Sequence, residues 1–419
     1  MHRATDTIAL PPDAVGPRAA ARRLCPRAAR NSFRGLWCAG VAGVLTACSA
    51  QPLERAAQPP LTNAPVAYQI DTVAEGLSYP WSGAFLPNGD MLVSERDGRL
   101  RIIRNGVLDP RPIAGLPNDI YVERQGGLFD VLADPDFANN KTLFLSYAGG
   151  DERANRTTVI RARFDGQALS NVAVIFKATP DKAGPMHYGG RMLMLPDRTI
   201  LLTVGEGYLQ KEKAQDLSSD LGKIVRIRTD GTLPADNPFL TADRAPEPAT
   251  GKARPEIWTS GHRNPQGLAR DPASGRIFAH EHGPRGGDEV NVLVPGANYG
   301  WPLASYGVDY TGLKITEFTS REGTEQPVVV WVPSIAPAGM AYYAGAAFPQ
   351  WSGDLFVATL SGMNVRRLDL KDGAIVGQQE LFGEVGERMR DVIAGPDGAL
   401  YLLTDSADGR VLRVRARTP

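Results

Sequence analysis

The feature that most constrains the fold of this 419-residue chain is a unit of sequence that recurs six times. Each unit contains an apolar residue, a turn built on Pro, Asp or Gly, a run of alternating apolar residues, a second turn and another short strand. The spacing of the units is uneven, as it would be if insertions lay between strands. The units begin at Leu86, Asp134, Leu195, Asp271, Trp351 and Gly395.

These units predict an all-β, six-bladed propeller over residues 66–419. No segment has the apolar periodicity of a helix, and the short strands are bounded by Gly, Pro, Asp and Asn. A sandwich or a barrel would also use short strands, but radial repetition of six similar units leaves few open sheet edges. We expect a strand around Ala67–Ile70 to join the last unit and close the ring, and we expect functional groups on the loops around the central channel.

The N-terminal segment has a different character. Seven arginines precede an uncharged stretch, Gly35 to Ala47, that is too short for a permanent membrane span but has the length of a signal-peptide core. This stretch ends in LTAC, which is similar to a bacterial lipobox, although ordinary cleavage near Ala47 is an alternative. We predict a lipoprotein-type signal peptide over residues 1–47, lipidation of Cys48 and a flexible Pro- and Ala-rich tether over residues 48–65.

This N-terminus predicts an exported protein, located in the periplasm and anchored by lipid to the cell envelope. Ser49, which follows the cysteine, indicates the outer membrane by analogy with bacterial sorting. The whole chain has 46 basic and 46 acidic side chains, a balance that provides no excess field for nucleic acid, so nucleic-acid binding is not expected. Once the signal is removed, only Cys48 remains of three cysteines, so no internal disulfide is expected.

Histidine is scarce, with five in the chain, so each one outside the signal is informative. His187 begins the turn HYGGR, in which paired glycines allow the backbone to approach a ligand closely. Its imidazole suits a general base, because histidine titrates near neutral pH. A turn histidine bonded to a nearby carbonyl fits the pattern equally well.

A second polar loop, GHRNPQG, contains Arg263 and Asn264. The guanidinium can donate two parallel hydrogen bonds to carboxylate or quinone oxygens, and the amide can add a further donor. The alternative is that both residues only hold a long propeller loop in place.

The third polar loop, HEHGPRGGDE, begins at His280. Two histidines at positions i and i+2 face the same side of a strand, so zinc has to be considered, but no third nitrogen or thiolate ligand is nearby in the sequence. The carboxylates of Asp288 and Glu289 and the carbonyls of the Gly-Pro turn suit a hard cation such as calcium. A solvated acidic turn is the alternative.

Five motifs in order carry a family resemblance. GHRNPQG, EHGPRGGDEVN and NYGWP, with HYGGR upstream and ERMRDVIAGPDGALYLLTD downstream, resemble the aldose sugar dehydrogenases that depend on pyrroloquinoline quinone (PQQ) and the related soluble glucose dehydrogenases. The similarity spans about Tyr79–Arg415. The resemblance implies an enzyme that uses bound PQQ and calcium to oxidise aldoses at the anomeric carbon to lactones and then passes electrons to an unidentified acceptor.

The resemblance also implies roles for individual residues. His187 matches the general base, and Arg263 matches a residue that stabilises charge during the reaction. The positions that match cofactor-binding residues are Gln125, Arg263, Asn264, Trp331, Arg388 and Arg390. The carbonyls of Gly283 and Pro284 match ligands of a catalytic calcium, and Glu289 and the Tyr299 carbonyl match ligands of a structural calcium.

The chain departs from the glucose dehydrogenase pattern at three places. Gly205-Glu206-Gly207 stands where those enzymes have an Asp-Gln pair, Ser361 replaces a cofactor-contacting Lys, and Met186 replaces an Asp before the base. These departures indicate the aldose dehydrogenase branch and leave the cofactor contacts of Glu206, Gly207 and Ser361 open. Two other functions fit a propeller: a calcium-dependent sugar-lactone hydrolase, and a non-catalytic binding protein.

Overall fold

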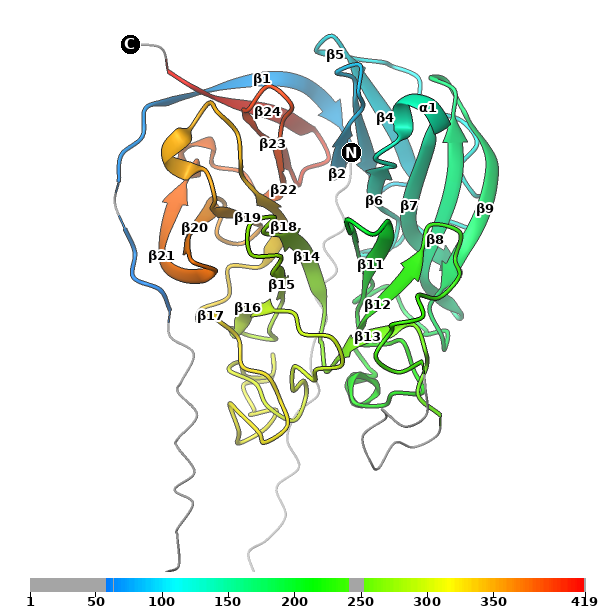
Figure 1. Cartoon of the computed structure of the whole chain (residues 1–419), viewed down its shortest axis with the longest axis vertical. Coiled ribbons are helices and arrows are strands. Elements are labelled where there is room, and N and C mark those ends of the chain that lie inside the picture. Colours follow the sequence, from blue (N-terminus) through cyan, green and yellow to red (C-terminus); the bar gives the residue numbers. More distant parts are fainter. Residues whose placement is uncertain (1–57, 63, 241–251, 418–419) are drawn as a thin grey trace, which may run out of the picture. The chain divides into compact units, whose positions relative to one another are not determined.

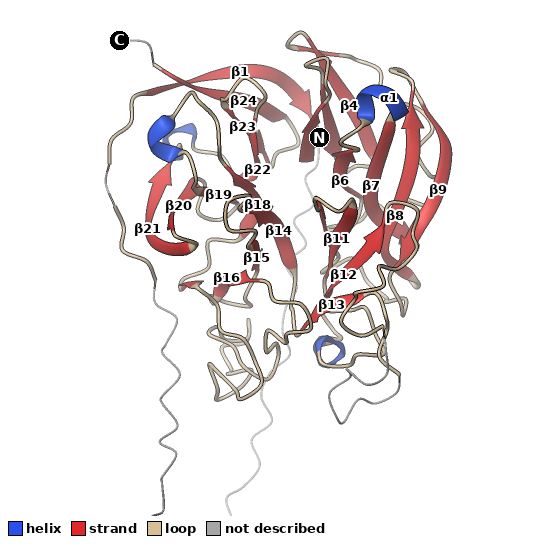
Figure 2. Ribbon diagram, viewed as in Figure 1, coloured by secondary structure: helices blue, strands red, loops and turns tan. Residues whose placement is uncertain are grey.

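The computed structural model describes residues 58–62, 64–240 and 252–417 (Figure 1). The predicted signal peptide and the predicted lipidation site Cys48 lie outside the described residues. Nearly all regular structure is β-strand (Figure 2), and within the described residues no helix is long and apolar enough to cross a bilayer. The exceptions are α1 (Phe137–Asn140) and short 3₁₀ turns at Lys211–Ala214, Pro349–Trp351 and Gly383–Val385.

The strands form six antiparallel, four-stranded sheets, which are the blades of a propeller. Blade 1 contains β2 (Pro80–Phe85), β3 (Met91–Glu95), β4 (Arg99–Arg104) and β5 (Val107–Leu108). Blade 2 contains β6 (Leu128–Ala133), β7 (Thr142–Gly150), β8 (Asn155–Phe164) and β9 (Leu169–Lys177). Blade 3 contains β10 (Gly189–Met194), β11 (Thr199–Val204), β12 (Lys223–Arg228) and β13 (Ile257–Ser260).

The second half of the ring repeats this arrangement. Blade 4 contains β14 (Pro265–Arg270), β15 (Ile277–Glu281), β16 (Asp288–Val292) and β17 (Val329–Trp331). Blade 5 contains β18 (Pro337–Tyr342), β19 (Leu355–Thr359), β20 (Val365–Lys371) and β21 (Ala374–Leu381). Blade 6 combines β22 (Met389–Ala394), β23 (Leu400–Thr404) and β24 (Gly409–Ala416) with β1 (Tyr68–Leu77).

The ring closes as the sequence predicts, because β1 from the start of the folded part pairs with β24 from its end. Tyr68 lies opposite Ala416, and Ile70 lies opposite Val414. The six-bladed propeller prediction is therefore confirmed. The first strand of each blade is innermost and packs against the first strands of both neighbouring blades, so these six strands surround the axis.

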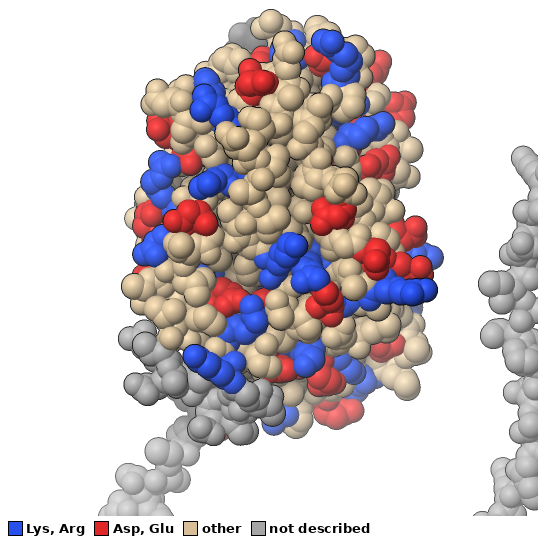
Figure 3. Space-filling view, turned by 90° about the vertical axis from the view of Figure 1, so that its right-hand side faces the viewer, with Lys and Arg blue, Asp and Glu red and all other residues tan. Residues whose placement is uncertain are grey.

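The hydrophobic core is divided among the six seams between neighbouring blades. Leu92 and Leu100 of blade 1 pack with Leu128 and Leu145 of blade 2, and each of the other seams holds a comparable cluster. Burying one such side chain contributes about 1.5–3 kcal/mol relative to leaving it exposed. Because the core lies in these seams, the polar strand ends and loops are not needed for it. On the face shown in Figure 3, basic and acidic side chains are interspersed.

The end of the predicted tether is part of the folded structure. Leu61 forms a parallel bridge with Gln378 of β21, and the Gln378 side chain donates to the carbonyl of Pro59 at 2.8 Å. The Thr62 N–H donates to the Gln378 carbonyl at 2.7 Å. Residues 58–62 are thus held along the edge of blade 5, which corrects our assignment of this stretch to a flexible segment that ends at residue 65. The sequence pattern lacked apolar periodicity here because the contacts are backbone and amide hydrogen bonds.

Candidate active site

All six blades contribute side chains to a cavity of about 230 Å³ near the propeller axis. Four of the predicted cofactor-binding residues line it: Gln125, Asn264, Arg388 and Arg390. The other lining residues are Trp81, Arg96, Phe129, Tyr188, Gly189, Gln266, His282, Ala336, Leu360 and Asp405. Residues more than 300 positions apart in the sequence meet here because the ring brings the blade ends together.

The predicted base, His187, lies directly beside this cavity, in the loop that enters β10. Its backbone N–H donates to the side-chain oxygen of Gln125 at 2.8 Å, and the residue is 4% exposed. Its φ of 50° is unusual for a residue other than glycine and is held by this surrounding structure. Burial lowers the pKa of His187 to about 4, although its hydrogen bond to Glu206 opposes the shift. The imidazole is therefore neutral at physiological pH and can accept a proton.

Glu206 is a residue of this site that the sequence analysis left open. Its Oε1 lies 3.1 Å from Nδ1 of His187, while its Oε2 is buried without a hydrogen-bond partner among the described residues. A carboxylate at Nδ1 fixes the tautomer of the ring and leaves Nε2 as the proton acceptor. The adjoining residue, Gly205, has to be glycine because the His187 backbone lies close to it: a Cβ at Gly205 would lie 2.5 Å from the His187 carbonyl oxygen.

Three arginines share one carboxylate at the opposite wall of the cavity. Asp405 accepts from Arg390 Nη2 at 3.0 Å and from Arg388 Nε at 3.1 Å, and Arg96 Nη1 lies 3.9 Å from it. Burial alone would raise the pKa of Asp405, but the three guanidinium groups hold it below its ordinary value. This wall carries more positive than negative charge, so it suits a ligand with several carboxylates. The sequence analysis predicted Arg388 and Arg390 and missed Arg96 and Asp405, which follow unremarkable strands.

Arg263 and Asn264 connect the base to the loop after β15. The guanidinium of Arg263 donates to the carbonyls of His282 at 3.1 Å and Gly283 at 2.9 Å, and its own carbonyl accepts from the Glu206 N–H at 2.9 Å. The side-chain oxygen of Asn264 accepts from the Gly189 N–H at 3.2 Å. Its amide NH₂ therefore remains as a donor to a ligand in the cavity.

Two of the predicted metal ligands, Gly283 and Pro284, belong to this loop, and Glu289 lies in β16 directly after it. A small cavity of about 10 Å³ is lined by Gly283, Glu289 and Arg263, among others. Burial and the neighbouring Glu281 carboxylate raise the pKa of Glu289 well above its ordinary value, and no cation of the described residues pairs with it. A divalent cation would relieve this repulsion, so Glu289 and the carbonyl groups around it fit calcium in charge and in ligand type.

Two further observations concern the predicted metal ligands. The described residues contain no group of three or more His, Cys, Asp or Glu that could hold a metal ion. Tyr299 is 5% exposed, and its ring stacks on His262 with centroids 4.8 Å apart. Tyr299 therefore packs in the core between blades 3 and 4.

Trp331 does not line the cavity, although the sequence analysis placed it near the cofactor ring. It is the last residue of β17, is 2% exposed and packs in the core between blades 4 and 5. Its indole N–H donates to the side chain of Gln378 at 2.9 Å. In the sequence, an aromatic residue shortly before Pro and Ser is compatible with either a cofactor contact or an outer strand. The register of β17 shows that Trp331 belongs to an outer strand. Trp81, which the sequence analysis missed, is the tryptophan that lines the cavity.

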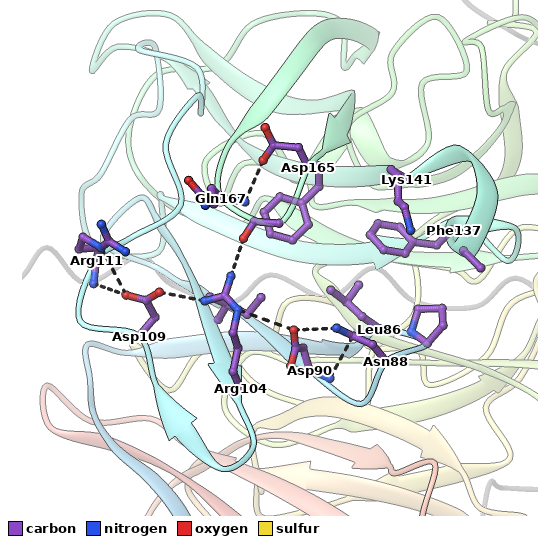
Figure 4. Close-up of a pocket in the computed structure, with 15 residues that line it drawn as sticks. Leu86, Asn88, Asp90, Arg104, Asp109, Arg111, Phe137, Lys141, Asp165 and Gln167 are labelled. Atoms are coloured by element: carbon purple, nitrogen blue, oxygen red, sulfur yellow. Dashed lines mark hydrogen bonds and ion pairs between the residues drawn. The ribbon is translucent and has the colours of Figure 1, made fainter.

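A larger cavity, of about 690 Å³, lies away from these residues, between blades 1 and 2 (Figure 4). Its two arginines are paired with carboxylates: Arg104 Nη1 lies 2.8 Å from Asp109, and Arg111 lies 3.8 Å from the same carboxylate. Phe137 and Phe164 line this cavity and also pack in the core cluster between blades 1 and 2. No base, amide cluster or excess charge converges there, so we assign the site to the axial cavity.

The family model for glucose/sorbosone dehydrogenases matches residues 77–413. The chain belongs to the glucose/sorbosone dehydrogenase family. Among curated proteins, the aldose sugar dehydrogenase YliI of Escherichia coli K12 is 39% identical and aligns over 84% of this chain and 94% of its own length. The family resemblance inferred from the motifs is therefore confirmed.

Solved structures of a glucose dehydrogenase and of an aldose sugar dehydrogenase share the same fold. A crystal structure of a glucose dehydrogenase is 42% identical, with a TM-score of 0.78, and the match covers 83% of this chain and 100% of that chain. The PQQ-bound form of an aldose sugar dehydrogenase from Streptomyces coelicolor is 29% identical, with a TM-score of 0.67 and coverage of 84% and 99%. The axial cavity thus lies in a propeller whose fold is shared by a relative that binds PQQ.

Proposed function

We propose that this protein is a PQQ- and calcium-dependent aldose dehydrogenase that oxidises the anomeric carbon of aldose sugars to the lactone. The observation that carries the proposal is the convergence of a neutral, carboxylate-oriented histidine and a cationic wall on one axial cavity. The PQQ-bound relative and the E. coli aldose sugar dehydrogenase support the cofactor and the substrate class.

His187 acts as the general base. Its Nε2 takes the proton of the anomeric hydroxyl, while Glu206 at Nδ1 stabilises the imidazolium that forms. The low pKa of His187 keeps the ring unprotonated before each turnover. PQQ, when bound, supplies the hydride acceptor, a chemistry that no protein side chain provides.

The cationic wall and the amides bind and orient the cofactor. Arg388, Arg390 and Arg96 would hold its carboxylates, whose burial without cations would be costly. Gln125 and Asn264 would contact its ring oxygens from the side of the base. Arg263, fixed by two carbonyls, provides a preorganised positive charge beside the reacting atoms.

Calcium would be held by carbonyl and carboxylate oxygens rather than by histidines. The Gly283 and Pro284 carbonyls would serve a catalytic ion, and Glu289 with the Tyr299 carbonyl would serve a structural ion. A bound divalent cation acts as a Lewis acid and also offsets the unpaired charge of Glu289.

The decisive experiment starts from metal-depleted protein. We expect that titration with PQQ and calcium restores reduction of an electron-acceptor dye in the presence of aldoses, and that a chelator abolishes it. The rival function, a calcium-dependent lactone hydrolase, predicts lactone hydrolysis without PQQ and no dye reduction. Activity that is unaffected by the chelator would contradict the calcium assignment.

We also propose that the chain is exported and lipid-anchored to the outer membrane through Cys48, on the strength of its LTAC motif. Metabolic labelling with an alkyne fatty acid should mark the wild type and fail to mark Cys48→Ala. The physiological electron acceptor would then have to be reached from the periplasmic side of the envelope.

A further inference from the structure

Tyr208 occupies the apex of a strained turn beside the base. Its φ is 69°, and the Leu209 N–H donates to the Gly207 carbonyl at 2.8 Å, which makes a three-residue γ-turn. γ-Turns with positive φ are rare and are energetically costly for a residue with a Cβ. Such strain persists only where the surrounding structure enforces it.

The turn is fixed to the catalytic residues themselves. The Gly207 N–H donates to the His187 carbonyl at 3.3 Å, and the preceding Glu206 N–H donates to the Arg263 carbonyl at 2.9 Å. A Cβ at Gly207 would lie 2.7 Å from Cδ of Lys182, so the turn also packs closely against the loop that leads to His187. The position of Tyr208 therefore follows from the position of the base.

The rings of Tyr208 and His187 make an edge-to-face contact. The two ring centroids are 5.1 Å apart and the planes are at 89°. The Tyr208 side chain is nevertheless 41% exposed, and its hydroxyl forms no hydrogen bond with the residues that the structure describes. A large half-exposed aromatic ring beside a buried base is available to a ligand, and aromatic faces pack well against the C–H faces of sugar rings.

We propose that Tyr208 is a specificity-determining residue that forms the wall of the sugar subsite next to His187 and binds the aldose ring through its aromatic face. This proposal rests on the proposed function. Because the contact is made to the sugar ring rather than to the anomeric hydroxyl, it is the same before and during the reaction. Tyr208 therefore contributes to substrate affinity and not to the rate of the chemical step.

The test compares three variants of the quinone- and calcium-loaded protein over a panel of aldoses. Tyr208→Ala should raise KM by about tenfold with kcat changed less than about threefold, whereas Tyr208→Phe should keep KM within about threefold. Leu209→Ala is the matched control, because Leu209 is in the same turn but is 83% exposed. The affinity for PQQ, measured by absorbance titration, should be unchanged in all three.

A second readout uses the quinone-free protein. Removing the ring that packs against His187 should raise the pKa of His187 from about 4 towards the ordinary histidine value in Tyr208→Ala, as followed by NMR titration of the imidazole. An unchanged KM in Tyr208→Ala, or an equal rise in Leu209→Ala, would overturn the assignment of Tyr208 alone. A wild-type protein that oxidises no aldose would overturn the proposed function, and this proposal with it.

Discussion

Two buried histidine–glutamate pairs lie in successive blades, and only one is suited to chemistry. In the first pair, Nδ1 of His187 lies 3.1 Å from Glu206; in the second, Nδ1 of His262 lies 2.8 Å from Glu281. The histidine precedes the inner strand of its blade in both pairs. The glutamate is 19 residues later, two residues after β11 in the first pair and at the end of β15 in the second. The repeat of the propeller thus places the same pair twice.

The difference lies in what surrounds each pair. His262 is fully buried, its Nε2 lies 2.9 Å from the Thr259 hydroxyl, and its ring stacks on Tyr299. Glu281 in turn accepts from the backbone N–H groups of Arg263 and Asn264. All functional atoms of the second pair are occupied, whereas Nε2 of His187 forms no hydrogen bond with any residue that the structure describes. The histidine–glutamate pair is therefore suited to catalysis only in the blade where one imidazole nitrogen makes no hydrogen bond within the protein.

The largest expected effect comes from removing the first histidine. His187→Ala should lower kcat by about 100-fold or more, the usual size of a lost general base, and leave PQQ binding intact. Steady-state dye reduction together with absorbance titration of PQQ measures both quantities. Near-normal turnover in this variant would end the assignment of His187 as the base.

The matched change in the second pair should affect stability instead. His262→Ala leaves the Glu281 carboxylate and the Thr259 hydroxyl buried with fewer partners, so we expect a loss of about 2 kcal/mol in the free energy of unfolding. Denaturant titration gives the free energy, and kcat of the folded protein gives the control. A fall of kcat as large as in His187→Ala, without loss of stability, would erase the distinction between the pairs.

A smaller effect is expected from the first carboxylate. Glu206→Gln keeps the shape of the side chain but removes the charge that stabilises the protonated imidazole, so kcat should fall by about tenfold. Glu281→Gln in the second pair serves as the comparison and should act mainly on the free energy of unfolding. Equal kcat in Glu206→Gln and wild type would show that Glu206 does not assist the base.

The smallest effect concerns pH. Because the pKa of His187 is about 4, the rate should stay constant as pH falls from neutrality and should halve only near pH 4. Glu206 raises this pKa, so Glu206→Gln should move the acid limb to lower pH. A limb near pH 6.5 in the wild type would mean that the base is not buried in the way described.

The same low pKa has a consequence for folding. The unfolded chain takes up a proton at His187 below about pH 6.5, and the native state does so only below about pH 4. The contribution of this group to stability is therefore present above pH 6.5 and is lost as pH falls towards 4. In His187→Ala the stability measured by denaturant titration should change less over this interval than in the wild type.

Much of the fold could be predicted from the sequence, because each propeller blade is encoded by residues that are close together in the chain. Turns on Pro, Asp and Gly and alternating apolar residues occur within each blade, so the number of blades and the closing strand near Tyr68 were both correct. The loops with His187, Arg263 and Gly283 could be identified because they concentrate polar groups and glycine. The tether boundary was wrong because residues 58–62 are held by backbone hydrogen bonds, which leave no apolar signal.

The sequence by itself determined the repeat, the three polar loops and the family motifs. Only the tertiary structure decided which of these residues meet. Arg96 and Asp405 lie together at the cationic wall, and Glu206 contacts His187. Trp331 packs in the core between two blades. The physical reason is that strand register and blade packing fix side-chain direction over separations of hundreds of residues. The availability of a single imidazole nitrogen depends on those long-range contacts and not on the identity of its neighbours in the chain.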